Sequence, residues 1–154
     1  MVIETKCFGT IEIDEEKIIT FEDGLLGLEE FKKYTIIYDS EDNRPIISWL
    51  QSVEEKDIAL PVINPLIVKA EYSPKVEDEL LSGLGELNED NFIILTIVVI
   101  RDEGKKVTTN LKAPLIMNVE NRKGVQVITE NEDYDIRYDI TKGIGELKKE
   151  KVGE

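Results

Sequence analysis

The sequence predicts a mainly β protein, namely a small antiparallel β-barrel-like or sandwich domain with one short helix. Three observations favour this class. About eight or nine short segments have the composition of strands and are separated by turn signals. A helix pattern is clear only once, over residues 73–83. Strands and helices do not alternate regularly, as they would in a parallel sheet.

The longest apolar segment is residues 92–101, FIILTIVVIR, which we expect to be the central strand. β-branched residues dominate it, and these lose less side-chain freedom in a strand than in a helix. It has one hydroxyl, on Thr96, and no charge before Arg101, which predicts burial on both faces. A membrane-spanning helix needs about twenty apolar residues, so we expect a core strand and no membrane association.

At the N-terminal end, residues 10–13 and 17–21 are predicted to form a hairpin, with its turn at residues 14–16. Residues 21–28, FEDGLLGL, contain two glycines three positions apart. Glycine permits backbone angles closed to other residues, so we expect a tight loop with exposed or half-buried leucines. The loop is expected to extend into one helical turn over residues 29–33.

Three strands are predicted in the middle of the chain, at residues 34–38, 46–52 and 58–65. The third contains Pro61 and Pro65, which have no backbone N–H to donate. It is therefore expected to be an edge strand or an interrupted one.

The helix over residues 73–83 begins with serine, proline and acids and carries leucines at helical spacing. After the central strand, residues 115–119 and 125–129 are expected to form a second hairpin. Residues 134–140 alternate between two faces and are predicted to form the final strand.

A chain of 154 residues is the size of one domain and buries enough surface to fold without a metal or a disulfide. We expect residues 1–140 to form a single β-barrel-like domain and residues 141–154 a charged C-terminal tail, either a short helix or frayed. The one cysteine, Cys7, is expected to be buried in a strand with a structural role. The N-terminus has no targeting pattern, so a cytoplasmic location is predicted.

The formal net charge is −14, which argues against direct binding of nucleic acid because such proteins neutralise phosphates. Basic protein partners are compatible with it. Acids concentrate in residues 71–90 and 130–139. Each stretch is either a solvated face or a negative surface that steers a basic partner. In the first stretch, Glu77, Asp78 and Glu79 are candidate partner-binding residues.

Histidine is absent, which removes the commonest general base and the commonest zinc ligand. We therefore predict no catalytic residues, no metal site and no cofactor. Residues 39–43 place oxygens at three positions of a calcium loop. Arg44 and Leu50, however, stand where such a loop needs glycine and a bidentate glutamate, and a solvated turn is favoured.

One alternative from another class stays open. A small-ligand-binding or enzymatic β-barrel could use Glu22 or Asp23 beside the loop that contains Gly24 and Gly27. Such a site would require a deep pocket with convergent polar groups and a carboxyl group whose pKa is raised.

Five motifs follow one another along the chain. They are FEDGLLG at residues 21–27, WLQS at 49–52, LPVINP at 60–65, TNLKAP at 109–114 with Asn118, and QVI at 126–128. In these words and in this order, the sequence resembles the bacterial flagellar assembly factor FliW family. Trp49 stands where that family more often has tyrosine. The resemblance implies a small β-barrel-like fold and a cytoplasmic regulator that is not an enzyme.

The resemblance also implies two protein partners. Proteins of this family bind flagellin before its export and, when free of flagellin, bind and antagonise the translational repressor CsrA. The acidic composition suggests that the protein mimics RNA and occupies the RNA site of CsrA as a decoy. The resemblance implies instead that it docks beside the RNA site, and both models stay open. The oligomeric state is open as well, with a monomer favoured.

Six polar residues of the motifs are set among apolar neighbours, where they either tie loops to strands or contact a partner. They are Gln51, Ser52, Asn64, Asn110, Lys112 and Asn118. The other motif residues are expected to fix loop geometry or fill the core: Gly24, Gly27, Pro61, Pro65 and Pro114, and Leu25, Trp49 and Leu111. A strand edge beside the prolines could accept a strand from a partner.

Overall fold

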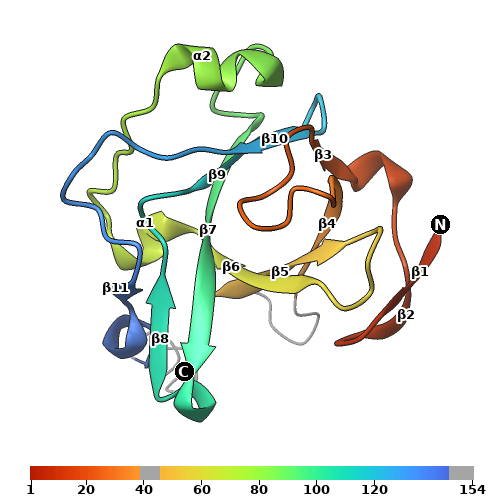
Figure 1. Cartoon of the computed structure of the whole chain (residues 1–154), viewed down its shortest axis with the longest axis horizontal. Coiled ribbons are helices and arrows are strands. Elements are labelled where there is room, and N and C mark those ends of the chain that lie inside the picture. The colour runs from red at the N-terminus through yellow and green to blue at the C-terminus, as the bar shows by residue number, and fades with distance from the viewer. Residues whose placement is uncertain (39–45, 146–154) are drawn as a thin grey trace.

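The computed structural model describes residues 1–38 and 46–145. The polar turn with the calcium-loop candidate, and residues 146–154 of the expected tail, lie outside the described residues. The protein is mainly β, as predicted, and its main sheet has nine strands (Figure 1). A separate two-stranded sheet is formed by β1 (Val2–Thr5) and β2 (Gly9–Glu12).

Seven strands of the main sheet close into a barrel. In order around it they are β7 (Phe92–Arg101), β6 (Ala59–Ile63), β5 (Ile47–Ser52), β4 (Lys33–Ile37), β3 (Ile19–Phe21), β10 (Lys123–Gln126) and β9 (Leu115–Asn118), which pairs back to β7. Among these neighbours β10 and β3 are parallel, and the other pairs are antiparallel. The barrel class and the second hairpin are thus confirmed.

The long strand β7 holds two parts of the fold together. Residues 92–95 pair with β9, and residues 98–101 pair with β8 (Lys106–Thr109) after the turn η3 (Asp102–Gly104). Strand β8 in turn pairs with β11 (Tyr138–Asp139). Because the second half of β7 extends beyond the barrel, Val99 and Ile100 are 42% and 45% exposed. Phe92, at the start of the strand, is 41% exposed as well. The expectation that β7 is buried on both faces is therefore wrong for both of its ends.

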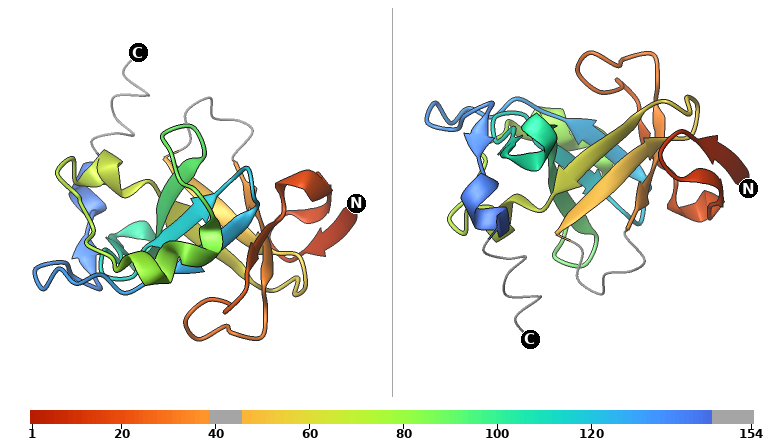
Figure 2. Two further views of the ribbon diagram at one scale, coloured as in Figure 1. Left: turned by 90° about the horizontal axis from the view of Figure 1, so that it is seen from above. Right: turned by 90° about the horizontal axis from the view of Figure 1, so that it is seen from below.

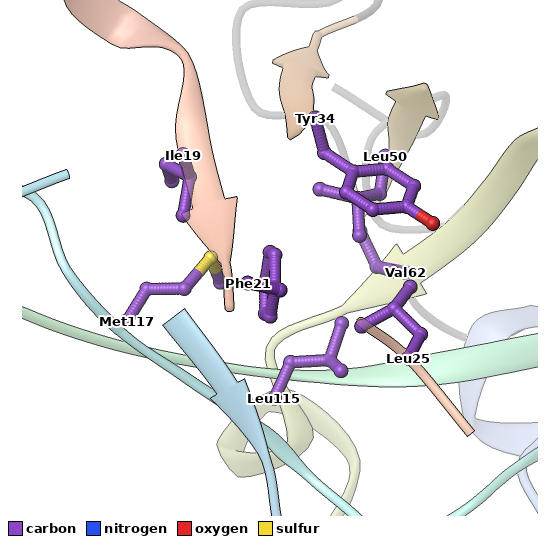
Figure 3. Packing of buried hydrophobic residues seen from close by; sticks show 8 residues of the cluster. All are labelled: Ile19, Phe21, Leu25, Tyr34, Leu50, Val62, Leu115 and Met117. Atoms are coloured by element: carbon purple, nitrogen blue, oxygen red, sulfur yellow. The ribbon is translucent and has the colours of Figure 1, made fainter. Parts of the chain in front are cut away.

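The main core lies inside the barrel. Its buried cluster is Ile19, Phe21, Leu25, Tyr34, Leu50, Val62, Leu115 and Met117 (Figure 3). The rings of Phe21 and Tyr34 meet edge to face, with centroids 5.7 Å apart. Leu25 and Leu111 are buried as predicted. Trp49 is not in this core: on β5 it alternates with the buried Leu50, is half-buried, and packs against Phe8.

The N-terminal hairpin prediction is wrong. β2 pairs with β1, and β3 pairs with β4 and β10. The acids expected to make the turn form η1 (Glu15–Lys17), where the Asp14 side chain accepts a hydrogen bond from Glu16 N at 2.9 Å. This capped turn redirects the chain without reversing it. Cys7 lies in the turn between β1 and β2 and is exposed, so its expected burial is wrong too.

Strand β6 is not an edge strand, since it lies between β5 and β7. Its ladder with β7 is nevertheless interrupted, because only Val62 and Ile63 pair. The ladder stops at Pro61, which has no N–H to donate. Pro65 lies outside the strand, at the first position of α1 (Pro65–Val68), where proline is favoured.

The predicted helix at residues 73–83 is shorter than expected. It consists of α2 (Asp78–Leu81) followed by η2 (Ser82–Leu84). The preceding amides are bound elsewhere: Ser73 N donates to Tyr134 Oη and Lys75 N to Asn131 Oδ1, both at 2.7 Å. These bonds hold the segment before α2 in an extended path. The same tyrosine lies outside any strand, and of the predicted strand at 134–140 only β11 forms.

The structure has more helices than the single one predicted, because α1 and residues 141–145 are also helical. Ile144 is buried with Ile140 and Val107 in a second apolar cluster, so the start of the expected tail packs on the barrel extension. The helical turn expected at residues 29–33 does not form, and β4 begins there instead. No helix in residues 1–38 or 46–145 has the length and apolar character needed to span a membrane.

Candidate functional site

A groove of about 530 Å³ is lined by residues of the α2–η2 segment, of β10 and of its neighbouring loop. We call it the α2–β10 groove. Figure 2 shows the ribbons of the α2–η2 segment (green) and β10 (blue), which contact each other. Six of its lining residues carry the argument below: Leu26, Leu80 and Ile128, and the acids Glu22, Asp23 and Glu79. The three apolar side chains are 56%, 46% and 59% exposed, respectively.

The loop at residues 22–28 forms one wall of the groove. Gly24 has φ +69°, and a Cβ there would lie 2.5 Å from Glu29 Cα, so glycine is required by both conformation and space. Leu25 points into the barrel core while Leu26 faces solvent. Gln126 on β10 holds the loop: its Oε1 accepts from Leu26 N at 2.8 Å and its Nε2 donates to Ala113 O at 3.1 Å. The loop with one exposed leucine agrees with the sequence prediction.

The opposite wall, α2–η2, is attached to the barrel by buried contacts. Leu84 packs with Ile116 and Val127 in one apolar cluster. Asn118 Nδ2 donates to Leu84 O at 2.8 Å, and Asn121 Nδ2 donates to the same carbonyl at 2.9 Å. Both walls are therefore fixed by side chains from the β9–β10 region.

Among the sequence-predicted partner residues, Gln51, Ser52 and Asn118 are buried. Gln51 Nε2 donates to Ser52 O at 3.0 Å. Ser52 Oγ accepts from Glu54 N and Glu55 N at 3.1 and 3.0 Å. The side chains of Gln51 and Ser52 therefore hold the loop that follows β5.

The other three polar motif residues are more accessible. Asn64 is exposed and caps α1 by accepting from Leu66 N at 3.0 Å. Asn110 and Lys112 are half-buried. Asn110 Oδ1 accepts from Lys112 N, and Lys112 Nζ donates to Asn131 O. None of the six polar residues lines the α2–β10 groove, although Asn118 supports its wall.

The acids predicted on the helix, Glu77, Asp78 and Glu79, are all exposed around the first turn of α2. Among the described residues, none of the three is in an ion pair. In the groove below them, Lys123 is paired with Glu22 at 3.2 Å. The groove and its rim are therefore net negative.

Several carboxylates serve as structural anchors. Glu54 accepts from Lys32 N and Lys33 N at 2.6 and 2.9 Å, and these backbone bonds lower its pKa. A backbone bond from Gly27 N likewise lowers the pKa of Glu29. The side-chain bond from Lys106 lowers the pKa of Asp139 to about 2. None of these three carboxylates lines the α2–β10 groove.

Sequence reasoning missed Leu80, Ile128 and Gln126 as elements of a site. The leucine pair at positions 80 and 81 carried a signal, since helical spacing cannot bury both on one face. In residues 1–38 and 46–145, no cluster of three or more cysteine or acidic side chains is arranged to hold a metal ion.

Comparison with known proteins bears on the whole chain. The family model described as FliW protein matches residues 2–140. The flagellar assembly factor FliW of Lachnoclostridium phytofermentans is 45% identical over 155 residues, covering 100% of this chain and 99% of that one. FliW of Lachnospira eligens is 45% identical over 142 residues, covering 91% and 94%.

The fold agrees with the sequence match. A crystal structure of the flagellar assembly factor FliW superposes with a TM-score of 0.82 at 31% identity, covering 91% of this chain and 96% of the other. The resemblance carried by the five motifs is confirmed. The chain belongs to the FliW family of flagellar assembly factors.

Proposed function

We propose that this protein regulates flagellum assembly in the cytoplasm by binding flagellin and, when free of flagellin, by binding and antagonising the translational repressor CsrA. Membership of the FliW family gives the role in flagellum assembly. The two partners are what the resemblance implies. On this proposal the protein is a monomer that acts by binding alone, without a reaction or a cofactor.

The observation that carries the proposal is the exposed acidic turn of α2, which has no ion pair among the described residues. Glu77, Asp78 and Glu79 are exposed on a protein of net charge −14. CsrA, as an RNA-binding protein, presents a basic face. Opposite charges speed association and fix orientation, and salt screens the effect over about 8 Å at physiological ionic strength.

Two modes of antagonism fit this charge. As a decoy, the acidic turn would occupy the RNA site and exclude RNA. As a neighbour, the protein would dock beside that site and weaken RNA binding through a coupling between two sites. We propose the second mode, as the family implies. A ternary complex of this protein, CsrA and RNA, detected by size-exclusion chromatography with light scattering, separates it from the decoy.

Variants of α2 test the proposal. The triple variant E77Q/D78N/E79Q keeps side-chain shape and removes charge. We expect it to slow association with CsrA at low salt, measured by surface plasmon resonance. The matched control E12Q/E15Q/E16Q removes the same charge from exposed acids near β2 and η1, and we expect it to associate nearly as fast as the wild type. If purified protein bound neither flagellin nor CsrA, the proposal would be wrong.

The polar motif residues divide between direct and indirect roles. Asn64, Asn110 and Lys112 have accessible surface, and we propose that they contact a partner. Gln51, Ser52 and Asn118 are buried, and we propose that they shape the loops that a partner meets.

A further inference from the structure

We propose that the α2–β10 groove binds an amphipathic segment of a protein partner, with apolar side chains that fill the groove and lysine or arginine side chains on its flanks. The inference rests on the proposed function in assuming a protein partner, and it identifies the surface and the chemistry that the partner must present.

The first support is the gathering of exposed apolar side chains. Leu26, Leu80 and Ile128 come from three distant parts of the chain, and all three line one groove. Each leaves about half of its surface in water. Single exposed apolar residues are ordinary, but a concave cluster of them is typical of a docking site. Covering such surface stabilises a complex by roughly 25 cal/mol per Å² before the costs of association.

The second support is the charge around these side chains. Glu22, Asp23 and Glu79 also line the groove, and its cation Lys123 is already paired with Glu22. Glu77 and Asp78 extend the negative rim along α2. A groove lined by both apolar and acidic side chains favours a segment that carries apolar residues with basic flanks.

The third support is that both walls are held in place. Gln126 fixes the loop through Leu26 N, and Asn118 fixes the end of η2 through Leu84 O. A site that is formed before binding loses less free energy to ordering when a ligand arrives. Both walls of the groove are thus held by hydrogen bonds within the protein itself.

The charge also selects between occupants. A second copy of this chain would bring a surface of the same sign, because each copy carries a net charge of −14. Like charges across an interface are repulsive. A basic amphipathic segment of another protein is therefore the favoured occupant.

The test uses the full chain and a short helical peptide with leucines on one face and lysines flanking them. Binding is measured by fluorescence anisotropy. We expect the triple variant L26S/L80S/I128S to bind this peptide at least about tenfold more weakly than the wild type. The matched control V2S/L66S/I136S removes equally exposed apolar residues elsewhere and is expected to bind like the wild type. A peptide with glutamates in place of the lysines is expected not to bind.

The outcomes separate the groove from the partners. No binding of the lysine peptide, or equal loss in the groove and control variants, would overturn the groove inference even if flagellin and CsrA bind. Binding of the peptide that depends on the groove, without binding of flagellin or CsrA, would support the groove and overturn the proposed function. Circular dichroism of each variant distinguishes unfolding from loss of the surface.

Discussion

Gln126 accepts a hydrogen bond from the backbone amide of Leu26 at 2.8 Å, joining residues 100 positions apart. The same side chain donates to Ala113 O. One amide group thus fastens the glycine-containing loop to β10 and sets the direction in which Leu26 faces. Both residues belong to motifs that carry the family resemblance, so the motif letters correspond to a structural tie.

Replacing Gln126 tests this tie. In Q126L both hydrogen bonds are lost, and we expect faster hydrogen exchange at Leu26 N and a stability loss of about 1 kcal/mol. In Q126E an oxygen remains to accept from Leu26 N, so the exchange rate is expected to stay near that of the wild type. The measurement is amide exchange by NMR. Equal protection of Leu26 N in Q126L and the wild type would contradict the tie.

Gly124 is expected to be intolerant of a side chain. A Cβ at this position would lie 2.6 Å from Phe21 Cε2 and 3.0 Å from Met117 Cγ, both in the barrel core. We expect G124A to lower the free energy of unfolding by about 1–3 kcal/mol through overpacking, measured by urea denaturation. The control is G83A, since nothing lies within 4 Å of a Cβ at Gly83. A G124A protein as stable as G83A would show that the β3–β10 contact is looser than described.

Two buried tyrosines are expected to respond differently to loss of the hydroxyl. Tyr72 Oη donates to Leu111 O at 2.7 Å, whereas Tyr34 Oη has no hydrogen-bond partner among the described residues. Burial raises the pKa of both, that of Tyr34 to about 12. We expect Y72F to cost about 1–2 kcal/mol and Y34F to be neutral or stabilising. Thermal denaturation of the pair is the measurement, and a larger loss in Y34F would refute the assignment.

Asp139 gives the stability a dependence on pH at the acidic end. Its pKa is lowered from 3.8 to about 2 by the bond from Lys106 Nζ and by the bond from Thr141 N. A lowered pKa contributes stability that is present above about pH 4 and is lost as the pH falls towards 2. D139N is therefore expected to lose less stability than the wild type across this window. The control is D133N, which alters an exposed aspartate. The stabilities of the wild type, D139N and D133N are compared by denaturation at several pH values and salt concentrations.

Much of the fold could be predicted from local composition. β-branched residues identified β7, β4 and β5, and the turn between two apolar runs identified the β9–β10 hairpin. Strand partners could not be read locally, because the acidic segment after β2 fits a tight turn or a capped 3-10 turn equally well. The alternation of residues 134–140 wrongly predicted a strand over the whole segment. Tyr134 lies outside any strand, and its hydroxyl accepts a hydrogen bond from Ser73 N.

The candidate site was predictable only in part. The density of acids in the sequence identified Glu77, Asp78 and Glu79 as a candidate surface. All three are exposed around the first turn of α2. The groove was not foreseen, because Leu25 and Leu26 are chemically alike and only barrel closure decides which one faces the core. The sequence likewise assigned no role to Gln126, although it belongs to a motif. Its two hydrogen-bond partners, Leu26 N and Ala113 O, are distant in the sequence and meet it only in the folded protein.

The parallel pairing of β3 with β10 has a consequence for synthesis of the chain. The seam between β3 and β9 stays open until residue 126 has left the ribosome, because β10 fills it. A nascent or prematurely terminated chain that ends before β10 therefore has an open ring and lacks the β10 side of the α2–β10 groove.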